Sequence, residues 1–241
     1  AYQENNLKQA QHAASKVGAY LPYRYNDEFH HLQGNIYLKQ KKYNEAIKIL
    51  GNYSGSTEWS NYAKYNLAIA LIMSDKHKQG ISLLNDVAKI KTTDIEQLAL
   101  RDKANLALGY AALRAKQHES AANYFKKVRL VGSQSNKALL GVGWAFHKEG
   151  KLKRSLVPWV ELKNRSSKDP AVQEALLTIP HALEGLNAKE QALAYYNDAI
   201  NSYNNEINSL DNVIKLVKSG EFITALRALH HRRPTAPAAQ L

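Results

Sequence analysis

The stretch LQGNIYLKQKKYNEAIKIL, residues 32–50, contains a spacing of side chains that recurs along the chain. The same offsets return in three further copies and, more weakly, in a fifth, and successive copies begin 34, 41, 34 and 37 residues apart. A period of this length predicts helix pairs stacked one after another. The aligned positions are Gly34, Tyr37, Tyr43, Ala46 and Leu50; Ala68, Leu71, His77, Gly80 and Leu84; Gly109, Ala112, His118, Ala121 and Phe125; Gly143, Phe146, Leu152, Ser155 and Trp159; and Pro180, Leu183, Lys189, Ala192 and Tyr196.

A 34-residue helix–turn–helix unit with small residues at its eighth and twentieth positions resembles the tetratricopeptide repeat (TPR). The first small residue is expected where the paired helix crosses, and the second admits close approach of the next helix. The resemblance covers about residues 27–200 and implies an all-α, right-handed α-solenoid of about five helix pairs with helical caps at both ends. The family's first-helix Trp is absent, and only Pro170 approximates its closing Pro. The expected repeats are residues 27–60, 61–94, 102–135, 136–169 and 173–206.

Amphipathic segments flank the repeats and are expected to cap them, because an end pair cannot bury its hydrophobic face alone. Residues Asn5–Val17 predict one capping helix, and Ala192–Val217 predict one long helix with apolar residues in helical rhythm. A short helix is expected over Phe222–Leu229, followed by a tail without apolar periodicity that should be mobile. The expected domains are 1–26 (cap and linker), 27–200 (repeats), 201–230 (long helix and cap) and 231–241 (mobile tail).

The composition favours a soluble protein with an excess of positive charge. Hydrophobic residues make up 44% of the 241 residues, and no run approaches the roughly 20 apolar residues that a membrane span requires. The formal net charge is +12 and the sequence pI is near 9.6, which favours acidic partners, anionic membrane surfaces or nucleic acid without choosing among them. Residues 126–168 concentrate this charge, because eleven basic residues there face only Glu149 and Glu161.

The chain contains no cysteine, which excludes disulfides, thiolate metal sites and cysteine nucleophiles. It begins at Ala1 without a methionine, and it is rich in Lys, Asn, Tyr and Gln. Together these features favour a periplasmic or envelope-associated location in a bacterium, with the cytoplasm as the alternative.

Catalytic signatures are missing from the sequence. It holds no G-x-S-x-G elbow, no phosphate-binding G-x-x-x-x-G-K, no G-x-G-x-x-G and no H-E-x-x-H. The adjacent His30 and His31 point in different directions on a helix, so they cannot clamp one metal ion as a pair four residues apart would. We therefore expect no enzyme activity, no cofactor and no metal site.

The TPR resemblance implies that the concave surface of the first helices is the binding face. Tyr and Trp side chains beside cations suit a protein or peptide partner with apolar and acidic groups. The alternative is that the aromatic residues belong partly to the core and that the lysines only solubilise the surface. The same resemblance also places Ile72, Leu106 and Leu140 on this face. The candidate binding residues are His31, Asn35, Lys39, Tyr62, Tyr65, Asn66, Lys103, Tyr110, Arg114, Trp144 and Lys148.

Some TPR domains hold a C-terminal carboxylate with a clamp of Lys, Asn and Arg side chains. Here Asn35, Asn66 and Lys103 fall on clamp positions, but His31 replaces one Lys and Ala107 replaces the Arg. Losing the bidentate Arg removes the strongest contact to a carboxylate, so a complete clamp is not expected.

Two prolines fall inside expected helices. Pro158 lies in a second helix, and Pro180 replaces the small residue of a first helix. Because proline removes a helical hydrogen bond at a cost of about 3 kcal/mol, we expect a bend in the solenoid near Pro180, or alternatively a helix that breaks in two there.

The leading functional hypothesis is a non-catalytic protein-interaction scaffold. One alternative is binding of a polyanion, namely nucleic acid, anionic lipid or glycan, through residues 126–168, although nucleic acid is not the expected partner. Another is a non-catalytic helical segment of a larger enzyme or envelope assembly. A homo-oligomer formed through the long C-terminal helix remains open.

Overall fold

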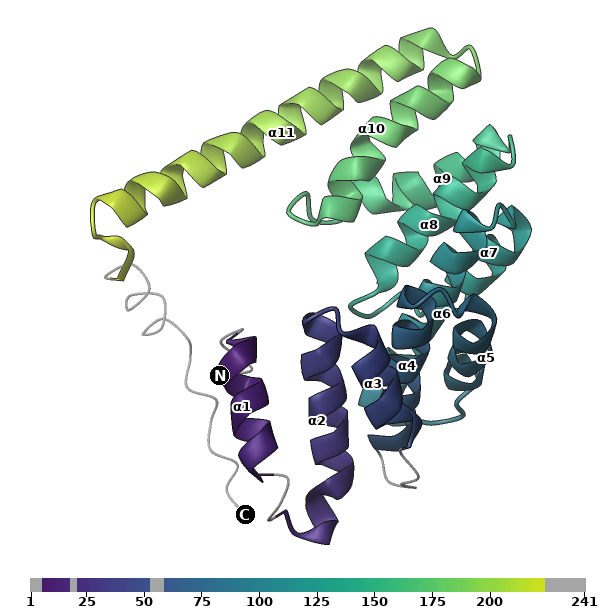
Figure 1. Cartoon of the computed structure of the whole chain (residues 1–241). Coiled ribbons are helices and arrows are strands. Elements are labelled where there is room, and N and C mark those ends of the chain that lie inside the picture. The colour runs from purple at the N-terminus through teal and green to yellow at the C-terminus, as the bar shows by residue number, and fades with distance from the viewer. Residues whose placement is uncertain (1–5, 18–20, 53–58, 224–241) are drawn as a thin grey trace, which may run out of the picture. The chain divides into compact units, whose positions relative to one another are not determined.

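In a computed structural model, which describes residues 6–17, 21–52 and 59–223, every regular element is helical (Figure 1). The all-α expectation is confirmed for this part of the chain. The helices form two compact units, residues 1–162 and 163–241. They are α1 (Leu7–Val17), α2 (Asn26–Lys39), α3 (Tyr43–Gly51), α4 (Trp59–Met73), α5 (His77–Ala88), α6 (Ile95–Arg114), α7 (His118–Phe125), α8 (Ser135–Lys148), α9 (Leu152–Lys163), α10 (Pro170–Gly185) and α11 (Lys189–Lys218), with a 3₁₀ turn, η1 (Tyr23–Tyr25), before α2.

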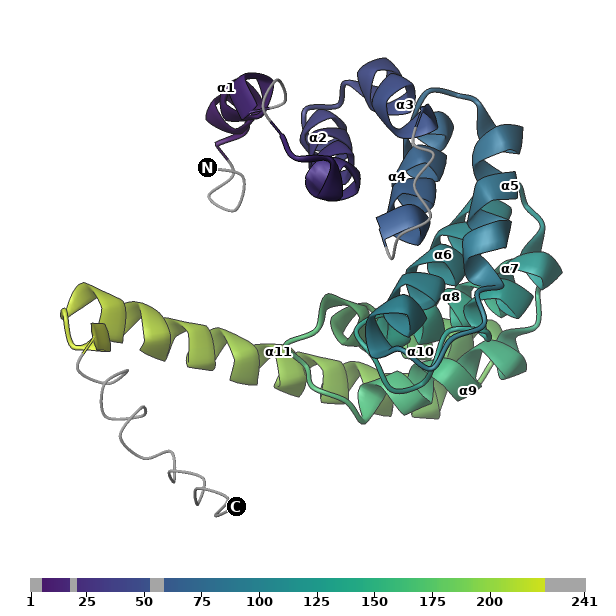
Figure 2. The same cartoon turned by 90° about the horizontal axis from the view of Figure 1, so that it is seen from below.

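Helix pairs stack in chain order within the first unit. Helices α2, α4 and α6 each contact their own second helix and the first helix of the next pair, so that α2, α4, α6 and α8 are successive neighbours. Figure 2 shows α2, α4 and α6 along the inside of an arc, with α3, α5 and α7 outside it. The first helices therefore share one continuous face.

Small residues allow the two helices of a pair to approach. A Cβ added to Gly34 would lie 2.5 Å from Leu50, and one added to Gly109 would lie 2.5 Å from Phe125. At Gly143 the added Cβ would lie 2.0 Å from Trp159 Nε1. The same pair of aligned positions meets in all three repeats, which confirms the expected crossing point.

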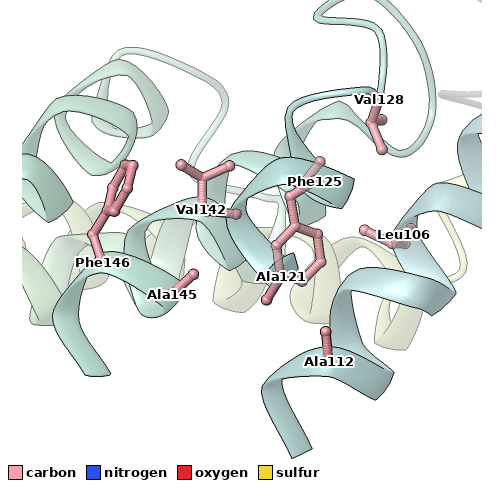
Figure 3. Packing of buried hydrophobic residues seen from close by; sticks show 10 residues of the cluster. Leu106, Ala112, Ala121, Phe125, Val128, Val142, Ala145 and Phe146 are labelled. Atoms are coloured by element: carbon pink, nitrogen blue, oxygen red, sulfur yellow. The ribbon is translucent and has the colours of Figure 1, made fainter. Parts of the chain in front are cut away.

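Large residues fill the space between pairs. Phe125 is 1% exposed and packs with side chains of α6, α7 and α8. Figure 3 shows its ring among Leu106, Ala112 and Ala121. A Cβ on Gly141 would also lie 2.6 Å from this ring, so Phe125 packs against glycines of two successive first helices.

The five turns inside the helix pairs share one backbone conformation. Each has a residue with positive φ seven positions after the first aligned residue of its copy: Lys41 (59°), Asp75 (64°), Lys116 (57°), Gly150 (78°) and Asn187 (59°). The next residue donates its N–H, at 2.9 Å in every case, to the carbonyl five positions earlier. This is the Schellman arrangement that ends a helix, and it marks all five copies of the repeat, including the weak fifth.

The second unit contains α10 and α11. Asp169 caps α10 by accepting a 2.8 Å hydrogen bond from the Ala171 N–H, and Pro170 occupies the first turn, where its missing N–H is not needed. Ala192 and Ala199 are the buried residues of α11, which packs on α10. Helix α11 corresponds to the long helix expected over residues 192–217.

Helix α10 continues through Pro180, so the expectation that it breaks in two there is wrong. Helix α9 likewise continues through Pro158. Both prolines are buried, which places each ring in packed surroundings that offset part of the lost hydrogen bond. The bend near Pro180 stays a prediction.

The N-terminal helix expected from Asn5 begins at Leu7, as α1. The expected helix Phe222–Leu229 lies outside the described residues except for Phe222 and Ile223, and the expected tail 231–241 lies wholly outside them. No described helix combines the length and apolar character needed to cross a membrane.

Candidate functional site

All eleven candidate residues lie on first helices of the first unit. Helix α2 carries three of them, α4 three, α6 three and α8 two. The structure brings some of them together in two places, one between α2 and α4 and one at the ends of α6 and α8. We name these the His31 cluster (His31, Asn35, Trp59, Tyr62 and Asn66) and the Trp144 pocket (Leu113, Arg114, Lys116, His118, Trp144 and Lys148).

Polar side chains in the His31 cluster bond mainly to one another. Asn66 Nδ2 donates to Asn35 Oδ1 at 2.7 Å, and Asn35 Nδ2 lies 2.9 Å from His31 Nε2. The His31 ring packs against Trp59 and Tyr62 with ring centroids 5.3 and 5.8 Å apart. A ligand at this place would have to replace hydrogen bonds that already exist.

Burial lowers the pKa of His31 below its ordinary value of 6.5, because an apolar environment disfavours the charged ring. In the neutral ring only one nitrogen can accept a hydrogen bond. Asn35 Nδ2 lies 2.9 Å from Nε2 and Asn66 Nδ2 lies 3.4 Å from Nδ1, so a neutral ring can accept a hydrogen bond from only one of these two amides. Burial therefore favours the uncharged form of the ring in this cluster.

The Trp144 pocket is a cavity of about 410 Å³. Arg114, Lys116 and Lys148 bring three cations to it, and no acidic residue is among those that line it. Leu113 and Trp144 supply apolar surface, and Lys148 Nζ lies 5.7 Å from the centre of the Trp144 ring. The buried Nδ1 of His118 has no hydrogen-bond partner within the described part of the chain. This chemistry suits an anionic group attached to an apolar one.

The position of Trp144 is set by the packing beneath it. Its ring meets the ring of Trp159 edge to face at 5.4 Å, and His147 packs against both rings. Trp159 is fully buried and donates its Nε1–H to the carbonyl of Leu140 at 3.2 Å. Since Gly143 leaves room for this indole, the repeat's small residue also supports the pocket.

Other candidate residues are not gathered into either site. Tyr65 packs against the core, where burial raises the pKa of its hydroxyl, and Tyr110 meets Phe125 edge to face at 5.1 Å. Lys39 and Lys103 are exposed. The placement of Ile72, Leu106 and Leu140 on the binding face is wrong, because all three are buried in the core.

No family model and no curated protein matches the chain. Solved structures of helical proteins do resemble it, and two of them serve as examples. One is MamA (residues 41 to the end) from Desulfovibrio magneticus RS-1, 12% identical, covering 75% of this chain and 96% of that one with a TM-score of 0.57. The other is a putative kinesin light chain of Podospora anserina with nearly identical TPR-like repeats, also 12% identical, covering 76% and 98% with a TM-score of 0.57. At these identities the likeness shows the fold. The chain has the fold of a TPR-like repeat protein.

The TPR-like fold explains why the clamp positions come together only in part. Asn35 and Asn66 lie on neighbouring first helices and are hydrogen-bonded to each other. Lys103 is exposed on α6, and Ala107, half-buried against the core, stands where the clamp Arg would be.

Sequence reasoning identified Arg114, Trp144 and Lys148 but missed Lys116 and His118. Both lie at the turn between the helices of the third TPR-like pair, whereas the family's groove positions belong to the first helix alone. The signal that could have found them is the position of the turn, seven to nine residues after Gly109.

Several basic residues of the 126–168 region contact acidic or aromatic side chains. Three of them make ion pairs: Arg129 with Asp102, Lys151 with Glu149, and Lys163 with Asp198, at 2.7, 2.5 and 2.6 Å. Others lie over aromatic rings, such as Arg154 over Phe146 at 4.3 Å. No group of three or more His, Asp or Glu within the described ranges is arranged to hold a metal ion.

Proposed function

We propose that the chain is a non-catalytic scaffold that binds a protein or peptide along its first helices, with the Trp144 pocket as the anchor site. The observation that carries this proposal is the composition of the pocket, where Arg114, Lys116 and Lys148 surround apolar surface from Leu113 and Trp144 without an acidic residue. Tryptophan and arginine are the residues most enriched among those that dominate binding energy at interfaces.

The pocket chemistry defines the bound segment. Arg114 can hold a carboxylate with two parallel hydrogen bonds, and the Trp144 ring offers a flat apolar surface to an aromatic or branched aliphatic side chain. A volume of about 410 Å³ accommodates a group of that size. The bound segment therefore places an apolar side chain next to Asp, Glu or a terminal carboxylate.

The His31 cluster has a lesser role in this proposal. Its asparagine amides and its histidine ring already hydrogen-bond to one another. A peptide that lies over the cluster therefore gains little from new polar contacts. Trp59 and Tyr62 offer partly buried aromatic surface there, which suits secondary apolar contacts along the same row of helices.

Binding of a polyanion has less support. A phosphate backbone requires many accessible cations along one surface, whereas Arg129, Lys151 and Lys163 already pair with carboxylates. The three cations of the Trp144 pocket surround one small cavity, which fits a single carboxylate better than a charged polymer.

Selection of peptides from a random display library against the whole chain tests the proposal. We expect the enriched peptides to share an apolar or aromatic residue beside Asp or Glu. Trp144→Ala and Arg114→Glu should each weaken a selected peptide by about tenfold or more, since each removes a central contact. Lys153→Glu makes the same charge change at an exposed position on α9 and should leave the affinity within about twofold.

Two results would contradict the proposal. Selected peptides that bind Trp144→Ala as tightly as the unaltered chain would remove the pocket from the binding site. Affinity that depends only on peptide charge, and falls by orders of magnitude between low and moderate salt, would favour polyanion binding instead.

A further inference from the structure

Helix α11 carries two rows of apolar residues with a strict spacing of seven. One row is Leu193, Ile200, Ile207 and Ile214; the other, three residues further along, is Tyr196, Tyr203, Leu210 and Val217. We call the two rows together the heptad seam. A repeat of 3.5 residues per turn, sustained over four heptads, is the pattern by which one helix winds around another.

Helix α10 contacts only the tyrosine row in the first half of the seam, since Leu193 and Ile200 of the other row are 63% and 56% exposed. Tyr196 Oη lies 3.3 Å from a carboxylate oxygen of Glu184, and Tyr203 Oη donates to the Gln173 carbonyl at 2.8 Å. With 30 residues α11 is nearly twice as long as α10, which has 16. Figure 1 shows the C-terminal half of α11 extending past α10.

The second half of the seam is exposed. Ile207, Leu210, Ile214 and Val217 keep 54%, 58%, 47% and 55% of their surface accessible. Single exposed apolar residues are ordinary, but a contiguous row of them marks an interaction surface. The heptad spacing indicates that the missing partner is another helix.

The residues of the seam point to a second copy of α11 as that helix. Isoleucine in one row with leucine in the other is the combination that favours two-stranded coiled coils, and Ile207, Leu210 and Ile214 follow it. A heptad seam is also self-complementary, so that two copies related by a twofold axis place the same residues in contact.

The charge of α11 also favours a second copy of this helix as the partner. The chain has a net charge of +12, so two copies repel each other over most of their surface. Helix α11 is the exception, since it holds three Lys against four Asp and Glu. Asparagines rather than lysines occupy much of the polar side of its second half, at Asn205, Asn208 and Asn212. Two copies can therefore approach along α11 without the repulsion that applies elsewhere.

We propose that the chain forms a homodimer in which the heptad seams of two α11 helices pair as a two-stranded coiled coil. The contact is independent of the Trp144 pocket, which lies in the other unit. Because α10 contacts Tyr196 and Tyr203, both rows are open together only in the second half of the seam. The interface is therefore short, and the dimer is expected to dissociate at low micromolar concentration.

Sedimentation of the whole chain, from about 1 to about 300 μM, measures this equilibrium. We expect a shift from monomer to dimer over that range. Ile214→Lys and Leu210→Lys should each weaken the dimer by at least about tenfold, because each places a charge in the seam. Asn212→Lys adds the same charge in the same helical turn but off the seam, and should dimerise with nearly unchanged affinity apart from modest added repulsion.

Circular dichroism measures the helical content of each variant and so separates loss of pairing from loss of folding. Substitutions at exposed positions of α11 should leave the helical content unchanged. A chain that stays monomeric at the highest concentration would overturn the proposal. So would a dimer that persists in both Ile214→Lys and Leu210→Lys, because its contact would then lie elsewhere. Dimerisation retained in Trp144→Ala is expected, which keeps this test separate from that of peptide binding.

Discussion

At the scale of single residues, glycine is required for two different reasons, namely lack of space for a side chain and a positive φ. Gly143 must lack a side chain because Trp159 occupies the space, whereas Gly150 has open space but a φ of 78°. We expect Gly143→Ala to lower the free energy of unfolding by about 1–3 kcal/mol through overpacking, and Gly150→Ala by about 1 kcal/mol through backbone strain. Chemical denaturation measures both.

Gly51 is the matched control for these two variants. It lies in the last turn of α3 with no atom within 4 Å of an added Cβ and without a positive φ. Gly51→Ala should leave stability unchanged or raise it slightly, because alanine restricts the unfolded chain. Equal losses in all three variants would contradict the packing described here.

His31 gives stability a dependence on pH. Its pKa in the folded chain lies below the 6.5 of the free side chain, so the unfolded chain takes up the proton first as the pH falls. The contribution of His31 is complete above about pH 6.5 and is lost progressively below it. The drop in melting temperature between about pH 7.5 and about pH 5.5 should be smaller in His31→Gln than in the unaltered chain, and unchanged in His12→Gln, an exposed control. An equal drop in all three chains would show that His31 is not buried as described.

At the level of residues, the sequence predicted contacts correctly where the repeat determines the size of the aligned side chains. The small residues at Gly34, Gly109 and Gly143 could be matched to large partners because the offset is constant. Burial of Ile72 and Leu106 could not be predicted, since a position at the edge of a helix face turns inward or outward according to the neighbouring pair. The turn residues Lys41 and Lys116 gave no sign of their positive φ, because glycine is the usual residue there.

At the scale of elements, one buried ion pair ties α6 to the segment after α7. The side chain of Asp102 is 3% exposed, and its two oxygens accept from the Arg129 backbone N–H at 3.3 Å and side-chain Nε–H at 2.7 Å. We expect Arg129→Ala to cost about 3 kcal/mol of stability, because it leaves a buried carboxylate without its cation.

The double variant Asp102→Ala with Arg129→Ala should lose less than Arg129→Ala alone, since no unpaired charge remains. Lys151→Ala, which breaks a more exposed pair with Glu149, should cost less than about 1 kcal/mol. Stability curves in urea measure all three. A double variant less stable than either single one would indicate that the pair itself, rather than the cost of an unpaired charge, dominates.

Element-level prediction was strongest for long amphipathic segments. The long C-terminal helix was expected over residues 192–217 and runs from Lys189 to Lys218. The alternative of a helix broken at Pro180 was wrong, because it gave the loss of one hydrogen bond more weight than the burial of α10, in which Ile179, Ala182 and Leu183 are also inaccessible.

At the scale of the whole molecule, the helix contacts are local, because within the first unit each helix from α2 to α7 packs on the next one in the chain. This is why the fold could be predicted from a repeat spacing alone, whereas the Trp144 pocket could be predicted only in part. The pocket combines the ends of two first helices with a turn. The groove positions taken from the TPR family lie on the first helices only and do not include the turn.

The three tryptophans offer a direct test of the central claim, that partners dock at the Trp144 pocket. Trp144 lines the pocket, Trp159 packs beneath it and Trp59 belongs to the His31 cluster. The measurement is the ¹H–¹⁵N spectrum of the three indole N–H groups as a selected peptide is added. We predict that the Trp144 resonance shifts most, that of Trp159 less, and that of Trp59 least. A shift at Trp59 with Trp144 and Trp159 unchanged would contradict the account.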